Sequence, residues 1–203
     1  MRTLIRLALL LWLVVVVTFT GGAVMAYEEP RYDIVHKADG YEVRKYDDRL
    51  AAQVAKNTSP NRAFGLLFGY ISGDNQKVEK VSMTIPVAQL EKIEMTVPVI
   101  QGPADGAGYM QFFLPSSYRL ETAPKPINPD VEIVVVKGGY YAVYSYSGRA
   151  NDSNFQEART VLLGRLSKDG VVPTSEMIRA TYNGPFTLPF MRRNEAMVRI
   201  NWP

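Results

Sequence analysis

Two amphipathic helices set among strand-like segments constrain the fold of this chain most strongly. The first is predicted to begin at Ser59-Pro60, a capping residue followed by a proline suited to the first turn, and to stop at Gly73. The second is predicted to open at Ser153 with a capping-box pattern and to stop at Gly170. Because each helix has one apolar face, each is expected to lie on a sheet. The apolar residues of the two faces are Phe64, Leu67, Phe68 and Ile71, then Phe155, Ala158, Leu162 and Leu166.

The segments around the helices alternate apolar and polar residues, as strands with one buried face do. They are residues 41–46, 111–114, 131–136, 140–146 and, more weakly, 197–202. Strands, a helix and further strands occur twice in the same order, with residues 125–129 as the joint. This joint is too short for a flexible linker. Residues 27–203 are therefore predicted to form a single domain with an internal pseudo-repeat.

A ten-residue pattern also occurs twice, at 80–89 and 92–101. Both copies read Lys, aliphatic, any residue, Met-Thr, aliphatic, Pro-Val, apolar, Gln. Because a proline removes a donor from a strand ladder, each copy is expected at a sheet edge or a bulge. The apolar residues at alternate positions favour a core strand over a binding motif.

Residues 1–26 have the layout of a secretory signal. Arg2 and Arg6 precede an apolar stretch at 7–19, and two glycines and small residues follow up to Ala26, where cleavage is expected. The alternative is an uncleaved membrane anchor, because the apolar character extends over about 20 residues, enough to span a bilayer. In both cases the domain is expected outside the cytoplasm, periplasmic or secreted, and attached to a membrane only if residues 1–26 remain.

The composition excludes several kinds of site and partner. The chain has no cysteine, which rules out disulfides, thiol nucleophiles, iron–sulfur clusters and covalent haem attachment. Its one histidine, His36, excludes a multi-histidine metal site. The net charge is only +3, and no Lys/Arg-rich run occurs, so a nucleic-acid partner is not expected.

A series of short motifs occurs in a fixed order along residues 27–203. They are Tyr41-Glu42-Val43-Arg44-Lys45-Tyr46, residues 64–73 with Asn75, the two Lys-x-x-Met-Thr-x-Pro-Val segments, Phe113-Leu114-Pro115, Pro124-Lys125-Pro126 and Arg192-Arg193-Asn194-Glu195. Together they resemble the SOUL haem-binding family over nearly all of the expected mature chain. The resemblance implies an α+β fold: a twisted, barrel-like antiparallel sheet with two helices, built from two pseudo-symmetric βαββ halves.

The resemblance also implies non-covalent binding of haem or another tetrapyrrole in a shallow apolar groove. This groove is placed beside the first helix and the loop before the last strand. Arg192 and Arg193 follow that loop and suit the two propionates, because an arginine fork matches a carboxylate. For the helix residues, spacing alone favours a core position over a ligand wall. The groove residues carried over by position are Phe64, Leu67, Phe68, Pro185, Phe186, Pro189 and Phe190.

The iron ligand is not assigned by the resemblance. Some members of the family have a histidine where this chain has Lys45, and that histidine has been considered an iron ligand. His36 does not match this position and is expected to be solvated. The thioethers of Met83 and Met95, or a tyrosine, are the alternatives that haem chemistry allows.

The sequence therefore predicts a haem carrier, buffer or sequestering protein that acts outside the cytoplasm. The alternative is a binding protein for another amphipathic molecule, such as a lipid or a pigment breakdown product, with haem binding incidental. A role in contacting a protein partner is a third possibility. An enzyme is not expected, because no two carboxylates are arranged as an acid–base pair. The carboxylates considered are Asp47, Asp48, Glu91, Glu94 and Glu195.

Overall fold

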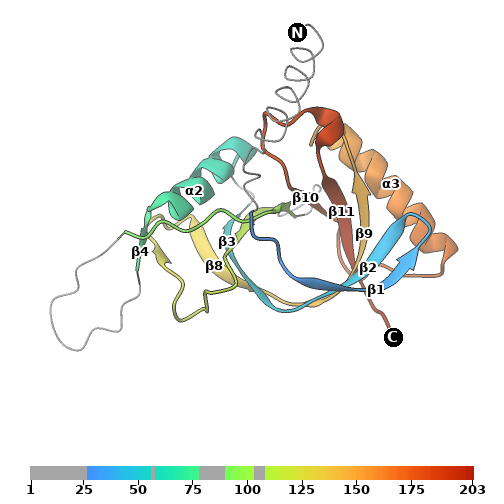
Figure 1. Cartoon of the computed structure of the whole chain (residues 1–203), viewed down its shortest axis with the longest axis horizontal. Coiled ribbons are helices and arrows are strands. Elements are labelled where there is room, and N and C mark those ends of the chain that lie inside the picture. Colours follow the sequence, from blue (N-terminus) through green and yellow to red (C-terminus); the bar gives the residue numbers. More distant parts are fainter. Residues whose placement is uncertain (1–26, 56–57, 78–89, 103–107) are drawn as a thin grey trace, which may run out of the picture.

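One curled antiparallel sheet and two helices make up the fold (Figure 1). The computed structural model describes residues 27–55, 58–77, 90–102 and 108–203. Within these residues the sheet has nine strands in the order β1-β2-β9-β11-β10-β5-β6-β3-β8. Their bounds are β1 Tyr32–Ala38, β2 Tyr41–Tyr46, β3 Arg49–Ala55, β5 Val99–Gln101, β6 Tyr109–Phe113, β8 Val131–Val136, β9 Gly139–Tyr146, β10 Ile178–Thr181 and β11 Asn194–Ile200. The predicted α+β class is confirmed, with its barrel-like antiparallel sheet and two helices.

The order of elements repeats along the chain. β3, helix α2 (Pro60–Ser72), β5 and β6 occur in this order, and β9, helix α3 (Asp152–Lys168), β10 and β11 occur in the same order later. A short ladder of β4 (Asn75–Gln76) and β7 (Lys125–Pro126) lies at the predicted joint. β5 pairs with β10 in the middle of the sheet, while β2 pairs with β9 and β8 with β3. The symmetry of the two halves in space stays a prediction.

The helix ends depend on local backbone chemistry. α2 ends before Gly73, whose φ of 131° is a conformation that only glycine adopts readily. The N-cap of α3 is Asn151, whose side-chain oxygen accepts a hydrogen bond from the N–H of Asn154 at 2.9 Å. The expected capping role of Ser153 is therefore wrong, because Asn151 caps the helix from outside its first turn.

Most of the predicted strands coincide with observed ones. β2, β6, β8 and β9 overlap the segments 41–46, 111–114, 131–136 and 140–146. β11 covers Asn194–Ile200 instead of the predicted 197–202, because its pairing with β9 begins at Asn194. The long-range ladder, which the local pattern does not show, sets this boundary.

The second copy of the ten-residue repeat, 92–101, contributes β5. This strand lies between β10 and β6, in the middle of the sheet, so the expectation of an edge or a bulge is wrong for this copy. Pro98 immediately precedes β5 and removes no donor from the ladder. The first copy, 80–89, lies outside the described residues.

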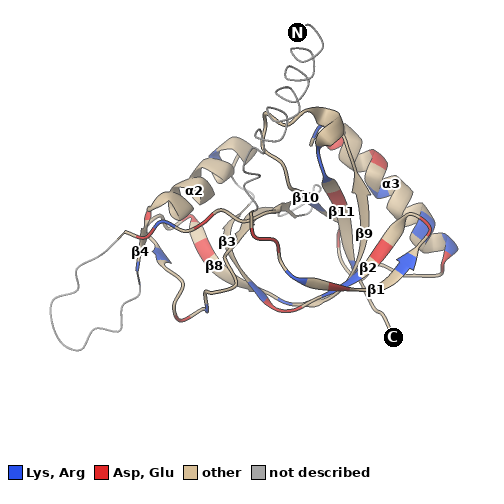
Figure 2. Cartoon of the chain, in the orientation of Figure 1, with Lys and Arg blue, Asp and Glu red and all other residues tan. Residues whose placement is uncertain are grey.

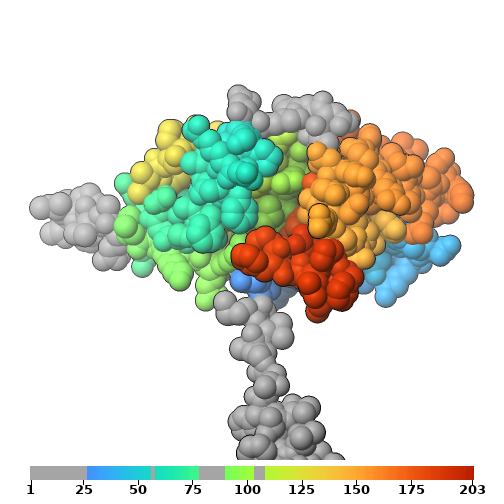
Figure 3. Space-filling view, turned by 90° about the horizontal axis from the view of Figure 1, so that it is seen from above, coloured from blue at the N-terminus to red at the C-terminus, as the bar shows by residue number. Residues whose placement is uncertain are grey.

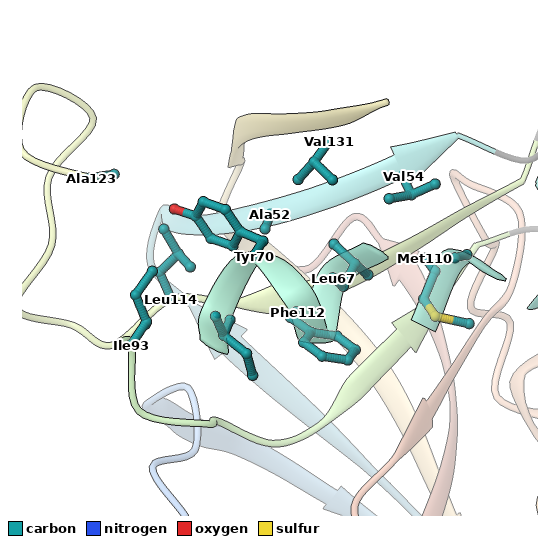
Figure 4. Packing of buried hydrophobic residues seen from close by; sticks show 12 residues of the cluster. Ala52, Val54, Leu67, Tyr70, Ile93, Met110, Phe112, Leu114, Ala123 and Val131 are labelled. Carbon is teal, nitrogen blue, oxygen red and sulfur yellow. The ribbon is translucent and has the colours of Figure 1, made fainter. Parts of the chain in front are cut away.

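The two helices cover the same face of the sheet. α2 packs on β3, β6 and β8 over a core that includes Leu67, Tyr70 and Phe112 (Figure 4). α3 packs on β9 and β11 over a second core around Leu162. Because side chains alternate along a strand, the opposite face carries a third core, around Tyr141, inside the curl.

The described part of the chain contains no helix with the length and hydropathy needed to cross a membrane. The predicted signal or anchor, residues 1–26, lies outside the described residues. The boundary at residue 26 stays a prediction.

Candidate functional site

Helix α2 presents an apolar surface to solvent. Phe64 and Phe68 are 40% and 49% exposed, and their rings are nearly parallel, with centroids 6.2 Å apart and an interplanar angle of 10°. Phe64 also packs edge-on against Phe112 of β6, with centroids 5.3 Å apart, which fixes its ring. α2 has one charged residue, Arg62, whereas α3 carries both signs of charge along its length (Figure 2). The exposed side of α2 is therefore suited to a flat apolar ligand.

Leu67 differs from the two phenylalanines beside it. Its side chain is completely buried and packs with Ala63 and Tyr70 in the core beneath α2 (Figure 4). The structure places Leu67 in the core and not in the wall of the predicted groove, because the side chain does not reach the surface. Phe64 and Phe68 are the two predicted helix residues that do.

Residues 184–191, between β10 and β11, form an exposed apolar loop. Phe186 is 98% exposed and Phe190 is 74% exposed, and Leu188 and Met191 are exposed as well. Residues Pro189–Met191 form a short 3-10 helix, η1. The apolar loop lies between the N-terminal ends of α2 and α3 (Figures 1 and 3). Exposed aromatic side chains are thus present both on α2 and on the loop next to it.

Arg192 ties the apolar loop together. Its Nε donates to the carbonyl of Thr187 at 2.8 Å, and its Nη2 donates to the carbonyl of Pro185 at 2.6 Å. A charged donor strengthens both bonds, so the loop keeps its shape without burying its aromatic side chains. These two bonds occupy N–H donors of Arg192 that were predicted to bind a ligand carboxylate.

Arg193 is likewise engaged within the protein. It donates to Glu195 Oε1 at 2.9 Å and to Glu29 Oε2 at 3.0 Å, and its guanidinium lies 3.7 Å from the centre of the Tyr182 ring. Two carboxylates already balance its charge. The predicted propionate contact therefore has no support at Arg193.

A groove runs between the N-terminal ends of the two helices (Figure 3). It has a volume of about 170 Å³, below the roughly 300–1,000 Å³ of pockets that enclose a whole small-molecule ligand. The groove is therefore too small to enclose a complete tetrapyrrole disc. Among the described residues the lining is mainly apolar and includes Val54, Ala63, Met110 and Phe155, with Asp152 and Arg179 as its charged side chains.

A larger groove, of about 470 Å³, lies beside residues 28–31 and 113–121. Acidic residues outnumber basic ones in its lining, which disfavours an anionic ligand. The acids are Glu28, Glu29, Asp47, Asp48 and Glu121, and the bases are Arg31, Arg49 and Arg119.

A buried ion-pair cluster lies on the inner face of the curled sheet. Glu195 is completely buried and accepts hydrogen bonds from Arg44 Nη1 at 3.1 Å, from the Tyr182 hydroxyl at 2.7 Å and from Arg193. Burial raises the pKa of Tyr182 far above its usual range, so this hydroxyl stays protonated and donates. Glu195 is thus the structural centre that links these side chains.

The buried Tyr46 predicts a loss of stability at alkaline pH. Burial raises the pKa of Tyr46 to about 12, whereas a tyrosine in the unfolded chain ionises near pH 10. The unfolded state therefore loses its proton first, and the stability contribution is complete below about pH 10 and is lost as the pH rises toward about 12. Urea unfolding at a series of pH values measures this decline, and Tyr46→Phe is expected to make it shallower. An equally steep decline in the variant would assign the effect to other groups.

The described residues contain no cluster of His, Asp or Glu side chains suited to hold a metal ion. His36 is exposed and lies against Trp202, with ring centroids 5.1 Å apart. Lys45 is exposed on β2, and Met95 packs against the core beneath α2. Met83 lies outside the described residues. None of the described residues among these four lines the groove between the helices.

Sequence reasoning did not single out the residues of this groove, Arg179 among them. Arg179 lies on β10 between Ile178 and Ala180, which belong to the core on the opposite face. A strand of four residues is too short for alternation to show which face its charged residue occupies. The place of Arg179 in the groove follows from the packing of α3 beside β10, which only the tertiary structure shows.

Comparison with known proteins gives the family of the chain. The family model described as SOUL heme-binding protein matches residues 27–199. No curated protein matches the chain in sequence. Solved structures of similar fold include a hydrolase from Listeria innocua, which is 10% identical and has a TM-score of 0.53, with 82% of this chain and 94% of that chain covered.

Two further structures show the same fold. An uncharacterized conserved protein from Listeria innocua is 9% identical, with a TM-score of 0.52 and with 87% of this chain and 94% of that chain covered. The C-terminal domain of EcmrR is 5% identical, with a TM-score of 0.51 and with 84% of this chain and 98% of that chain covered. At such low identity these likenesses concern the fold alone. The family match extends over most of the chain, and the protein belongs to the SOUL haem-binding family.

Proposed function

We propose that the protein binds haem or a similar flat tetrapyrrole non-covalently, on the surface formed by Phe64, Phe68 and the apolar loop. The observation that carries this proposal is the pair of exposed, parallel phenyl rings on α2. A porphyrin is a flat apolar disc, and stacking on aromatic rings buries it without requiring a deep pocket. Phe186 and Phe190 on the neighbouring loop supply a second aromatic wall.

The side chains at this surface fit a ligand that is held by packing. Bound haem would supply a redox-active iron. Because His36 lies against Trp202, the histidine of this chain does not serve that iron from the described surface. The same observation favours a second candidate: an iron-free tetrapyrrole, or another flat amphipathic molecule, suits the surface equally well.

The cellular role that we propose is carriage, buffering or sequestration of this ligand outside the cytoplasm. The signal-like pattern of residues 1–26 supports export. A partly exposed binding surface supports reversible transfer, since the ligand can leave without unfolding of the protein.

Binding rather than catalysis is part of the proposal. Two solved structures of the same fold, each 10% identical to this chain, are described as hydrolases. In this chain the completely buried carboxylate, Glu195, accepts hydrogen bonds from Arg44, Arg193 and Tyr182. Glu195 is therefore engaged in structural hydrogen bonds and is not presented to a substrate at the surface.

A haemin titration of the purified protein, followed by Soret absorbance, tests the proposal. We expect a saturable one-to-one change, weakened about 10- to 100-fold by Phe68→Asp and by Phe186→Asp, because a buried charge opposes stacking. Val172→Asp is the matched control, since Val172 is an exposed apolar residue beyond the other end of α3. No spectral change, or equal binding by all variants, would refute the proposed surface.

A further inference from the structure

Arg179 is a buried guanidinium with unused hydrogen-bond donors. The residue is 8% exposed, and its Nε has no hydrogen-bond partner among the described residues. Its polar contact in the described chain is from Nη2 to Asp152 Oδ1, at 2.6 Å. Buried donors in native proteins nearly always have an acceptor, so this nitrogen points to a ligand that supplies one.

The partner that Arg179 does have is weakly held. The Asp152 side chain is 92% exposed, so solvent screens the pair and water readily replaces this carboxylate. The aliphatic and apolar surroundings of Arg179 are firmer, since its guanidinium lies 4.7 Å from the centre of the Phe155 ring. The guanidinium is thus fixed in place while its counter-ion is exchangeable.

A second buried donor without a partner in the described chain lies at the end of β9. The hydroxyl of Tyr146 is buried and has no hydrogen-bond partner in the described chain. Burial raises the pKa of Tyr146, and the positive charge of Arg179 opposes that rise. The positive charge of Arg179 favours an anionic acceptor over a neutral one.

The first turn of α2 adds to this positive potential. The side chain of the N-cap residue Ser59 makes no capping hydrogen bond, and the first turn contains no acid. The positive end of the helix dipole is therefore uncompensated where Pro60 and Ala63 line the groove.

We infer that the groove between the helices binds a carboxylate of the ligand, with Arg179 as the anchoring residue in exchange for Asp152. The inference rests on the proposed function. Ala63 lines the groove next to Phe64, and Met110 of the groove shares a face of β6 with Phe112, which contacts Phe64. A disc stacked on Phe64 and Phe68 thus has the groove at its border, where a carboxylate-bearing edge fits the small volume.

Mesoporphyrin IX and its neutral dimethyl ester separate the contribution of carboxylate binding from that of aromatic stacking. We expect the wild-type protein to bind the diacid about 10- to 100-fold more tightly than the ester, and Arg179→Gln to remove this preference while ester binding stays. Asp152→Asn, which removes the competing acid at an exposed position, is expected to tighten diacid binding several-fold. Arg62→Gln is the matched control, because Arg62 is an exposed arginine in the first turn of α2, the turn that borders the groove.

The NMR signal of the Arg179 Nε–H gives a direct readout, since a carboxylate on this donor shifts it. A saturable shift with the diacid and none with the ester supports the site. If both compounds bind and Arg179→Gln affects them equally, or the Nε–H signal does not move, the carboxylate site is refuted and tetrapyrrole binding stands. If the wild-type protein binds neither compound, the proposed function itself is refuted.

Discussion

Replacing Glu195 with glutamine is expected to lower the free energy of unfolding by about 3–5 kcal/mol, because removing one partner of a buried ion pair leaves the other charge uncompensated. Glu195 is completely buried and lies 3.1 Å from the guanidinium of Arg44, whose side chain is also buried. Glutamine keeps the shape of the side chain but not its charge. Urea unfolding of the purified protein, monitored by circular dichroism, measures the loss.

Glu42→Gln is the control for this prediction. Glu42 also pairs with Arg44, at 2.8 Å, but its side chain is partly exposed, so solvent stabilises the charges that remain. We expect a loss of about 1 kcal/mol or less for this variant. Equal losses for the two variants would show that burial of Glu195 does not govern the stability of the cluster.

Leu67→Ala is expected to lower the free energy of unfolding by about 2–5 kcal/mol, since it leaves a cavity in a closely packed core. The Leu67 side chain extends from α2 into the core with Tyr70 and Phe112 and has no exposed surface (Figure 4). The folded fraction of this variant is expected to bind haemin as the wild-type protein does. Chemical unfolding and a haemin titration of the same sample measure both quantities.

Phe68→Ala is the matched variant for Leu67→Ala, because we expect it to change haemin affinity and not stability. Its ring is 49% exposed, so its removal is expected to cost about 1 kcal/mol or less in stability. Haemin affinity, by contrast, is expected to fall about tenfold, because a stacking surface is lost. If Leu67→Ala weakened binding and Phe68→Ala did not, the ligand would lie elsewhere on the molecule.

The apolar spacing of α2 shows how much of the site could be predicted from local sequence. The spacing located α2 and its apolar residues, because these depend on neighbours within one or two turns. It did not separate Leu67 from Phe64 and Phe68, since all three fall within one broad apolar face. The separation depends on where β3 and β6 meet the helix, and therefore on contacts across the sheet.

Arg192 and Arg193, which follow the apolar loop, show that the partners of polar groups could not be predicted from the sequence. Their positions suited ligand carboxylates, but Arg192 bonds the carbonyls of Thr187 and Pro185, and Arg193 pairs with Glu195 and Glu29. Glu29 lies 164 residues away from Arg193 in the chain. A sequence pattern does not show which partners folding brings to a guanidinium.

The sequence by itself determined the family, the α+β class, both helices and the apolar character of α2 and of residues 184–191, because these follow from motif order and short-range periodicity. Only the tertiary structure decided the central place of β5, the burial of Leu67 and the convergence of both helix N-termini on Arg179. Those features depend on strand pairing between segments far apart in the chain, such as β5 with β10 and β2 with β9. Such pairing is selected by the packing of the whole sheet, which no local window of residues contains.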